Sequence, residues 1–453
     1  MTNLLKKYNI PVPRYTSYPP ANYFNESFTA KDYESALYDS NTSDPQHLSF
    51  YFHIPFCRHL CYYCGCNSFA MAKQDKIDQY ISALLKEMDM VLPYINKQRK
   101  IAQIHYGGGT PTTLPVAILK RLNERLLSTF STIDKPEIAI ECHPAYLDET
   151  YWQSLIEAGF NRFSIGIQDF DEKVLKVSNR KLSLLPLEII FQILRQKNAG
   201  INLDFLYGLP LQTADGFVKS IEKTIELQTD RLVTFSYAHV PWVNKRQLLL
   251  EKTGLPAQEE KSRMYEQARE ILNQAGYQAI GLDHFVKPSD ELYTALKNRQ
   301  LHRNFQGYCT RRTTGQVYAF GVTAISQLSG AYAQNSKSID DYIARLNQGF
   351  ATVKGYFLSK DEQITREVIE TLMCNYSLDW QDLSERLALP VENIKQATAY
   401  NTARFQEFAA DGIIFFDKNR IEIKPEGRLF VRNVAAALDK LMLHTDKTFS
   451  KPI

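Results

Sequence analysis

Residues 51–67 read YFHIPFCRHLCYYCGCN, in which an apolar segment runs into four cysteines spaced within ten residues. The chain of 453 residues has only seven cysteines, and the remaining three, Cys142, Cys309 and Cys374, stand singly. Crowded thiols in a chain otherwise poor in cysteine indicate metal ligands rather than a secreted disulfide framework. We therefore expect a reducing compartment and, because the first residues do not resemble a signal peptide, a cytoplasmic location.

The apolar segment is the first of six short runs that alternate with longer stretches of helical period. Helices are predicted over residues 75–92, 116–130 and 262–276, where apolar residues recur every three or four positions. This alternation predicts βα units around a parallel sheet, arranged either as an open sheet or as most of a barrel. The six predicted strands are LSFYFHI (48–54), IAQIHY (101–106), EIAIEC (137–142), RFSIGI (162–167), INLDFLYG (201–208) and LVTFSYAHV (232–240).

Glycines, cysteines and polar residues gather at the ends of these runs. The carboxyl ends of parallel strands meet at one edge of an α/β fold, and active sites are built there. We therefore expect one site shared by all six strands. Its parts are the cysteine loop, GGGTP (107–111), Glu141, Gln168, residues 204–210 and residues 237–239.

The pattern changes beyond about residue 355. Helical stretches at 361–375 and 391–412 precede a predicted hairpin and a last helix, which predicts a smaller helical, winged-helix-like domain. A winged helix also suggests DNA binding, but no basic patch stands out in a chain with 53 Lys and Arg against 50 Asp and Glu. No apolar run approaches the roughly 18 residues of a membrane span. The predicted parts are a leader over the active site (1–45), a barrel with its extension (46–355) and a C-terminal cover (356–453).

The cysteine spacing C-x3-C-x2-C, with one more cysteine two residues later, suits an iron–sulfur cluster. Zinc is an alternative, although zinc knuckles normally come as two separated pairs, and a disulfide is disfavoured in a reducing compartment. If Cys57, Cys61 and Cys64 bind three irons, the fourth iron keeps a position open for a ligand. Cys66 is then free of the cluster, and its alternative role is to pack the loop as a small buried residue.

The triad in a loop after the first strand is similar to that of the radical S-adenosylmethionine (SAM) enzymes. This resemblance implies that the open iron of a [4Fe–4S] cluster chelates SAM and that the reduced cluster releases a 5′-deoxyadenosyl radical. Nine segments, taken in order, narrow the resemblance to the oxygen-independent coproporphyrinogen III oxidases. They are PRYTSYP (13–19), residues 51–67, HYGGGTPTTL (105–114), SIGIQDF (164–170), LDFLYGLPLQT (203–213), YAHVP (237–241), DHF (283–285), HRNFQGY (302–308) and GVTAIS (321–326).

The family resemblance implies a three-quarter (β/α)6 barrel and anaerobic haem biosynthesis, in which two propionate side chains of coproporphyrinogen III become the vinyl groups of protoporphyrinogen IX. The cofactor supplies the difficult step and the protein positions it. The resemblance also implies SAM contacts at Tyr51, Gly108, Glu141 and Ile325. The alternatives are a tight turn at the glycines and a surface carboxylate at Glu141, although an unpaired charge at the end of an apolar strand is costly.

A second SAM beside the first is also implied by the resemblance. Its predicted contacts are Tyr63, Gly109, Thr110, Gln168, Arg180, Asp204 and Ala238. An ordinary salt bridge is the alternative for Arg180 and Asp204. Tyr63 stands where the family often has phenylalanine, and RRTTGQVYAFG (311–321) replaces a loop that often carries an acidic residue.

A flexible tetrapyrrole with four carboxylates requires arginines and aromatic residues at the cavity mouth, since arginine binds carboxylates through two hydrogen bonds. The predicted substrate residues are Arg14, Tyr15 and Arg303, with Arg311 and Arg312 as further candidates. Each has a surface or capping role as its alternative. Cys66 and Gln306 are the predicted catalytic residues, while His239 and His302 are expected to be structural.

The main alternative function is a haem-binding chaperone that shares the barrel and the triad. Such relatives generally carry phenylalanine at the position of Cys66 and lack the PRYTSYP leader, so two features of this chain argue against it. A radical enzyme acting on RNA is disfavoured because no basic, aromatic-rich surface segment supports it. The expected partners are the tetrapyrrole and a protein that reduces the cluster, with no nucleic acid, and the expected active form is a monomer.

Overall fold

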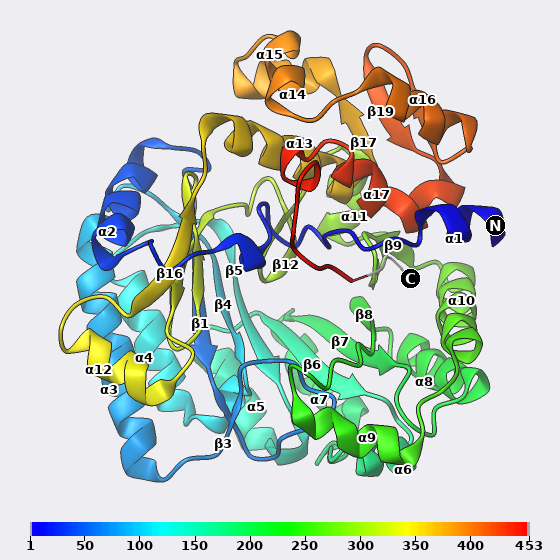
Figure 1. The fold of residues 1–453 in the computed structure, drawn as a ribbon. Helices are drawn as coiled ribbons and strands as arrows, with labels where there is room; N and C mark the ends of the chain where they lie inside the picture. The colour runs from blue at the N-terminus through cyan, green and yellow to red at the C-terminus, as the bar shows by residue number, and fades with distance from the viewer. Residues whose placement is uncertain (1, 451–453) are drawn as a thin grey trace.

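A twelve-stranded sheet forms the centre of the computed structural model, which describes residues 2–450 (Figure 1). Its order is β16-β15-β14-β13-β1-β4-β5-β6-β7-β8-β10-β9. The six predicted strands are confirmed, and they lie side by side in chain order, each parallel to the next. They are β1 (Leu48–Ile54), β4 (Ile101–Gly108), β5 (Thr132–Cys142), β6 (Arg162–Gln168), β7 (Gly200–Tyr207) and β8 (Arg231–Ser236).

Helices cover one face of these strands (Figure 1), and in β7 buried residues alternate with partly buried ones, which fits one covered face. In β1, six of seven residues are buried. The three predicted helices are confirmed with slightly different ends, as α3 (Gln74–Val91), α4 (Val116–Leu127) and α10 (Gln258–Gln274). The other helices of this part are α5 (Glu149–Glu157), α6 (Glu172–Val177), α7 (Leu187–Arg195), α8 (Ala214–Glu226) and α9 (Leu248–Thr253).

Additional strands extend the sheet at both sides without closing it. On one side β13 (Gln316–Phe320) runs parallel to β1, and β14 (Ile325–Gln327), β15 (Ala331–Asn335) and β16 (Thr352–Phe357) follow antiparallel. On the other side β10 (His284–Val286) and β9 (Gln278–Ile280) continue antiparallel from β8. Since β16 and β9 are the two edges, the fold is a partial (β/α)6 barrel rather than a closed one.

Smaller elements surround this sheet. A hairpin of β11 (Leu301–Asn304) and β12 (Gly307–Thr310) forms a separate two-stranded sheet, and β2 (Phe56–Cys57) pairs with β3 (Phe69–Ala70) across the cysteine loop. The remaining helices before the C-terminal region are α1 (Thr2–Tyr8), α2 (Ala30–Asp39), α11 (Glu291–Lys297) and α12 (Ile339–Leu346). Within the described residues, no helix combines the length and the apolarity needed to cross a membrane.

The C-terminal region has its own core and a small sheet in the order β17-β19-β18. Its elements are α13 (Lys360–Asn375), β17 (Ser377–Asp379), α14 (Trp380–Leu387), α15 (Val391–Ala397), α16 (Thr402–Ala410), β18 (Ile414–Phe416), β19 (Arg420–Ile423) and α17 (Val431–Ala436). The helical stretch predicted over 391–412 is two helices, not one. Asn401 causes the break, because its side chain accepts hydrogen bonds from the Ala403 and Arg404 amides and so starts a new helix.

The N-terminal leader belongs to the C-terminal core. Tyr8, Tyr15 and Tyr18 are buried in that core, and the hydroxyls of Tyr15 and Tyr18 donate to the two oxygens of Asp439 at 2.9 and 3.1 Å. Arg432 of α17 donates from Nε to the carbonyl of Pro13 at 3.0 Å. In Figure 1 the leader accordingly runs between the barrel and the C-terminal helices.

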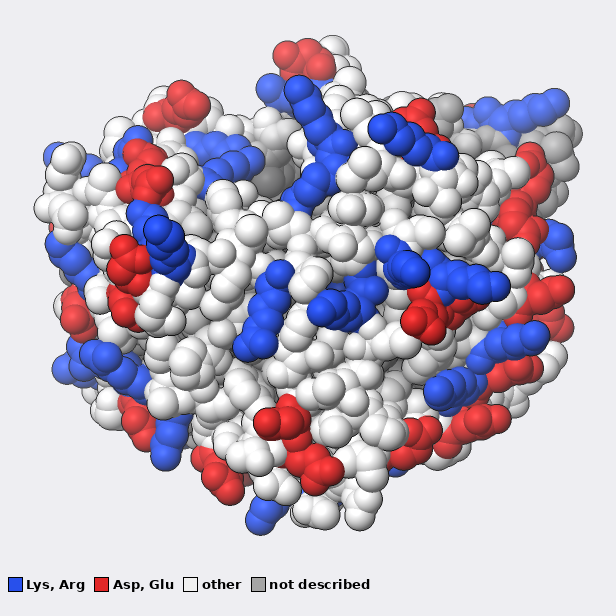
Figure 2. All heavy atoms as spheres, turned by 90° about the horizontal axis from the view of Figure 1, so that it is seen from below, with Lys and Arg blue, Asp and Glu red and all other residues white. Residues whose placement is uncertain are grey.

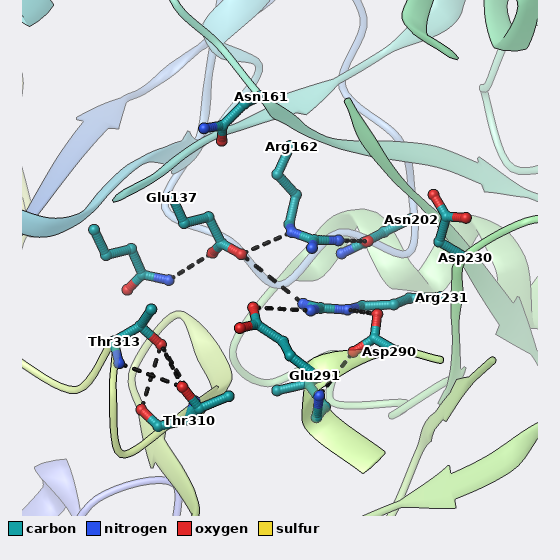
Figure 3. Close-up of polar contacts among 12 residues, drawn as sticks. Glu137, Asn161, Arg162, Asn202, Asp230, Arg231, Asp290, Glu291, Thr310 and Thr313 are labelled. Carbon is teal, nitrogen blue, oxygen red and sulfur yellow. Dashed lines mark hydrogen bonds and ion pairs between the residues drawn. The ribbon is translucent and has the colours of Figure 1, made fainter. Parts of the chain in front are cut away.

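A charged network occupies the amino edge of the sheet, opposite the expected site (Figure 3). Glu137 of β5 accepts from Arg162 Nε at 2.7 Å, and Arg231 reaches Glu137 at 4.0 Å and Asp290 at 2.8 Å. Burial alone would raise the pKa of Glu137, but the two guanidinium groups lower it to about 2. This edge of a barrel contributes to stability, so we assign Glu137 a structural role.

Candidate active site

The cysteine loop follows β1 at the carboxyl edge and is held on two sides by hydrogen bonds. On one side, the Tyr62 amide donates to the Ser178 carbonyl at 3.0 Å, and Asn179 donates to the Leu60 carbonyl at 2.9 Å. On the other side, Asn244 donates to the Cys64 carbonyl at 2.6 Å. The loop is therefore fixed between the start of the α6–α7 connection and the segment that follows β8.

Cys57, Cys61 and Cys64 line one cavity of about 180 Å³, here called the cysteine cavity. All three thiols are free. Among residues 2–450, the one group of three metal-binding side chains with ligand atoms within 4.8 Å of one another is His302, Glu367 and Glu370. The three cysteine sulfurs do not form such a group, so at least one pair of them lies more than 4.8 Å apart, wider than the roughly 3.8 Å that tetrahedral zinc with Zn–S bonds of about 2.3 Å requires. Their spacing fits a multi-iron cluster better than a single ion.

Polar neighbours surround the three thiols. Arg180 lies 3.5 Å from Cys61 Sγ, and Thr110 Oγ1 lies 3.4 Å from Cys57 Sγ. Burial raises the pKa of Cys57, whereas a hydrogen bond with Cys66 lowers the pKa of Cys64 to about 6. The cavity therefore contains a fixed positive charge beside the sulfurs, which favours thiolate ligands and the negative charge of an iron–sulfur cluster.

A second cavity of about 480 Å³ adjoins the first and is here called the Tyr51 cavity. It brings together all four residues predicted for the first SAM, Tyr51, Gly108, Glu141 and Ile325. Glu141 lies in the lining of both cavities, and His105 Nε2 is 3.2 Å from its carboxylate. The structure therefore places Glu141 in the lining of both cavities, with 43% of its side chain exposed.

Three further residues line the Tyr51 cavity that were not predicted from the sequence, namely His53, His105 and Phe305. His53 Nδ1 lies 3.1 Å from the Tyr51 hydroxyl, and burial lowers the pKa of His53. A signal existed, because His53 and His105 occur within two quoted motifs at alternate strand positions that share a face with Tyr51 and Gly107.

The glycines of GGGTP are required by close approach inside the protein. A Cβ at Gly107 would lie 2.5 Å from Glu141 Oε1, and one at Gly109 would lie 2.6 Å from the Pro55 carbonyl. Gly108 has φ +112° and faces the His53 ring. The Gly109 amide donates to the Ile54 carbonyl at 2.7 Å. These contacts support the turn interpretation, and at the same time they leave the Gly108 backbone at the border of both cavities.

Cys66 also lines both cavities. It is the one cysteine of the chain whose residue is exposed, whereas Cys57 and Cys61 are buried. This exposure argues against the alternative in which Cys66 packs the loop as a small buried residue. Cys66 lies where the two cavities meet, together with Gly108 and Glu141.

Six of the seven residues predicted for a second SAM line the cysteine cavity, and Ala238 is the exception. Gln168 ends β6 at a register shift and has φ +71°, a conformation that redirects its side chain. Asp204 accepts from Ser164 at 2.6 Å, and burial raises the pKa of Asp204. No ion pair joins Arg180 to Asp204 in the part of the chain that the structure describes, so the salt-bridge alternative is wrong.

The predicted substrate residues divide into two groups. Arg14 lies 3.6 Å from Asp283 and stays half exposed, and Arg303 contributes to the lowered pKa of the same aspartate. The leader, the DHF motif (283–285) and the HRNFQGY motif (302–308) therefore meet around Asp283. Tyr15 is instead buried against Asp439. Gln306 lines the Tyr51 cavity, and its buried Oε1 has no hydrogen-bond partner.

The remaining candidates make structural contacts, as their alternative interpretation predicts. Arg311 pairs with Glu367 at 3.4 Å, and Arg312 pairs with Glu291 at 2.9 Å beside the amino-edge network. His302 lies 3.1 Å from Glu370, and this partner together with Cys309 raises the pKa of His302 to about 9 although burial opposes the shift.

Comparisons with known proteins agree with this arrangement. Residues 51–224 match the family model of the Radical SAM superfamily, and residues 358–430 match the HemN C-terminal domain. The oxygen-independent coproporphyrinogen III oxidase of Synechocystis is 37% identical, with 99% of this chain and 97% of that protein covered. The Escherichia coli protein of the same name is 38% identical, with 96% and 94% covered.

A solved structure described as coproporphyrinogen III oxidase (HemN) from Escherichia coli, a radical SAM enzyme, superposes with a TM-score of 0.87. The two chains are 35% identical, and the superposition covers 97% of this chain and 98% of that one. The likeness therefore extends over the leader, the barrel and the C-terminal region together.

Proposed function

The chain belongs to the oxygen-independent coproporphyrinogen III oxidases, and from this premise we propose that it converts two propionate side chains of coproporphyrinogen III into vinyl groups under anaerobic conditions, yielding protoporphyrinogen IX. One observation carries the proposal beyond family membership. Two adjoining cavities at the carboxyl edge share Cys66, Gly108 and Glu141, and one of them holds the three free thiols.

Cys57, Cys61 and Cys64 are the proposed ligands of a [4Fe–4S] cluster. When bound, the reduced cluster and SAM supply a primary carbon radical that can take hydrogen from an unactivated C–H bond. The Tyr51 cavity is the proposed site of this SAM, where Tyr51 and Ile325 bury its apolar parts and Glu141 binds its polar groups. Since these side chains project from β1, β5 and β14, the partial barrel positions them rigidly.

A second SAM is proposed at the cysteine-cavity residues Tyr63, Gly109, Thr110, Gln168, Arg180 and Asp204, with Ala238 at its margin. Arg180 supports this proposal, because its Nε is buried without a hydrogen-bond partner. Asp204 likewise has a carboxylate that no cation pairs among the described residues, although it is desolvated. Buried polar groups of this kind are normally satisfied, so a bound polar molecule is expected to complete them.

Each decarboxylation removes one hydrogen from the propionate carbon that is β to the carboxyl group, then carbon dioxide and one electron. We propose that Arg14 and Arg303 bind substrate carboxylates and that Gln306 orients the reacting propionate from within the Tyr51 cavity. Tyr15 contributes by holding the leader against Asp439. The monomer is also the proposed active form, with residues 1–45, 46–355 and 356–453 as leader, barrel and cover.

The direct test is anaerobic incubation of the reconstituted protein with coproporphyrinogen III, SAM and dithionite, followed by mass spectrometry of the tetrapyrrole. The expected product has lost two carbon dioxide molecules and four hydrogen atoms. A haem-binding chaperone would leave the tetrapyrrole unchanged and would bind haem stoichiometrically, and that pair of results would contradict the proposal.

Cys66→Ser tests the residue at the junction of the two cavities. Serine changes the size of the side chain little but removes the thiol, so we expect normal iron content and at least about a tenfold lower rate of product formation, or ~1.4 kcal/mol of transition-state stabilisation. Cys309→Ser, which lines neither cavity, is the control and should retain activity. Loss of the cluster would show that Cys66 is a ligand, and an unchanged rate would remove it from the reaction.

Arg14→Ala tests the leader more cleanly than truncation, because Tyr8, Tyr15 and Tyr18 belong to the C-terminal core. Loss of a charge-assisted contact with a carboxylate should raise KM for coproporphyrinogen III about tenfold. Iron content and kcat should stay near those of the parent. Arg420→Ala, on the C-terminal hairpin, is the matched control. A KM equal to that of the parent would remove Arg14 from the substrate site.

A further inference from the structure

An apolar patch protrudes from the segment between β8 and α9. Trp242 is 79% exposed and Val243 is 71% exposed, although both are large apolar side chains. Adjacent exposed residues of this kind, and tryptophan above all, are characteristic of protein–protein contacts. The proposed reaction does not use either side chain, and neither lines a cavity described above.

This patch lies directly beside the cysteine loop. Asn244, the residue after Val243, donates to the Cys64 carbonyl at 2.6 Å. Gln247 donates to the Tyr63 carbonyl at 3.1 Å. A molecule that covered Trp242 would therefore lie against the outer side of the loop that holds the proposed cluster ligands.

The surroundings of the patch are basic. We define the cluster face as residues 57–73, 171–184 and 239–252, the three segments joined by the hydrogen bonds around the cysteine loop. Apart from Arg180, which lines the cysteine cavity, these segments carry eight Lys and Arg against three Asp and Glu, a net charge of +5, whereas the whole chain has a net charge of +3. Figure 2 views the molecule from the end where Figure 1 labels β3, α6 and α9, and Lys and Arg side chains cross the middle of that surface.

Two of the cluster-face cations, Arg58 and Lys181, lie on the side of the loop away from Trp242. Arg58 and Lys181 both lie over the Tyr146 ring, at 5.1 and 5.7 Å from its centre. Lys245 follows Asn244 and is exposed. Positive side chains thus flank the loop on both sides, with the apolar patch next to them.

We propose that the cluster face docks a small acidic protein that carries single electrons on a flavin or iron–sulfur centre. The inference rests on the proposed function, in which the cluster must receive one electron before each turnover. In this step one electron leaves the reduced carrier and enters the cluster, while no covalent bond forms or breaks. The basic residues steer the acidic partner, and Trp242 and Val243 provide the apolar contact of a small, transient interface.

The test compares two reductants on the reconstituted protein. Reduced flavodoxin, a small acidic flavin protein, is mixed anaerobically with the cluster-loaded enzyme, and cluster reduction is followed by stopped-flow absorbance without substrate. Dithionite, which needs no docking surface, serves as the second reductant. For Trp242→Ala we expect flavodoxin-driven reduction to be about tenfold slower and dithionite-driven reduction to stay within twofold of the parent.

The charge of the face is tested by Lys245→Glu and Lys181→Glu, with Lys97→Glu and Leu443→Ala as exposed controls outside it. At low salt the two face variants should slow the flavodoxin reaction severalfold, and their rates should depend less on ionic strength than that of the parent. Titration of flavodoxin into the protein by calorimetry provides a readout that does not require an active enzyme, and binding should weaken in the same variants only.

Three outcomes would overturn the docking proposal. They are an unchanged flavodoxin rate in Trp242→Ala, an equal loss of rate with both reductants, and a parent dimer that dissociates on Trp242→Ala, which would assign the patch to a second copy of the chain. None of these three outcomes depends on decarboxylation, so each can be told apart from a failure of the proposed function. Failure of the dithionite-driven enzyme to decarboxylate coproporphyrinogen III would refute that function while leaving cluster reduction measurable.

Discussion

Replacing Cys61 by alanine is expected to abolish the [4Fe–4S] cluster and, with it, all product formation. Cys61 is buried, lines the cysteine cavity with Cys57 and Cys64, and has the Arg180 guanidinium 3.5 Å from its sulfur. With only two thiolates left from the triad, the protein binds too few irons to hold the cluster in which the fourth iron stays open for SAM. Iron and sulfide content after anaerobic reconstitution, together with the visible absorption spectrum, measure the effect. Cys57→Ala and Cys64→Ala should behave in the same way.

Cys142→Ala is the matched control for the triad. Cys142 is also buried and lines the same cavity, but it lies on β5, outside the spaced motif. We expect this variant to keep its full iron content. If the three triad variants retained the cluster, or if Cys142→Ala lost it as completely as they do, the assignment of the ligands would be wrong.

Glu137→Gln is expected to lower the free energy of unfolding at pH 7 by about 3 kcal/mol, the scale for removing one charge from a buried ion pair. The side chain is only 17% exposed, and its carboxylate neutralises Arg162 and Arg231. Glutamine keeps the shape and leaves Arg162 without a charged partner among the described ion pairs. The shift of the urea midpoint of unfolding measures the loss. Glu291→Gln, whose side chain is 36% exposed, should cost less than about 1 kcal/mol.

The contribution of Glu137 to the free energy of unfolding should decrease as the pH falls. Because the arginines lower the pKa of Glu137 from 4.5 to about 2, the folded state holds the carboxylate more strongly than the unfolded chain does. The stabilisation is therefore complete above pH 4.5 and disappears as the pH falls toward 2. The difference between the parent and Glu137→Gln should accordingly narrow between these values. A difference that is the same at pH 7 and at pH 3 would contradict the electrostatic explanation.

Much of the fold follows from local pattern. The six parallel strands were predictable because each is a short apolar run followed by a longer helical period, and the confirmed helices α3, α4 and α10 show the expected spacing. The one clear error, the single helical stretch at 391–412, arose because the propensity of the flanking residues concealed the capping signal of Asn401. The local sequence therefore contained the information needed, but the helix propensity of the flanking residues outweighed the capping signal, and one continuous helix was predicted.

Long-range pairing was not predictable in the same way. Arg180 and Asp204 were a plausible ion pair by charge, yet Arg180 donates to Tyr63 while Asp204 accepts from Ser164. Tyr15 was expected at the substrate, and its hydroxyl is instead bonded to Asp439, 424 positions away. Charge and hydrogen-bonding capacity allow many partners for each side chain, and only packing of the whole chain selects one of them.

By itself, the sequence determined the strand and helix order, the three-cysteine spacing and the glycine turn, because each depends on residues within a few positions of one another. Tertiary structure alone decided that Cys66 lies between two cavities, that the leader completes the C-terminal core, and that Glu137 meets Arg162 and Arg231. These features require chain segments that are far apart in sequence to meet in space. Their geometry is set by burial of the common core, which no local pattern encodes.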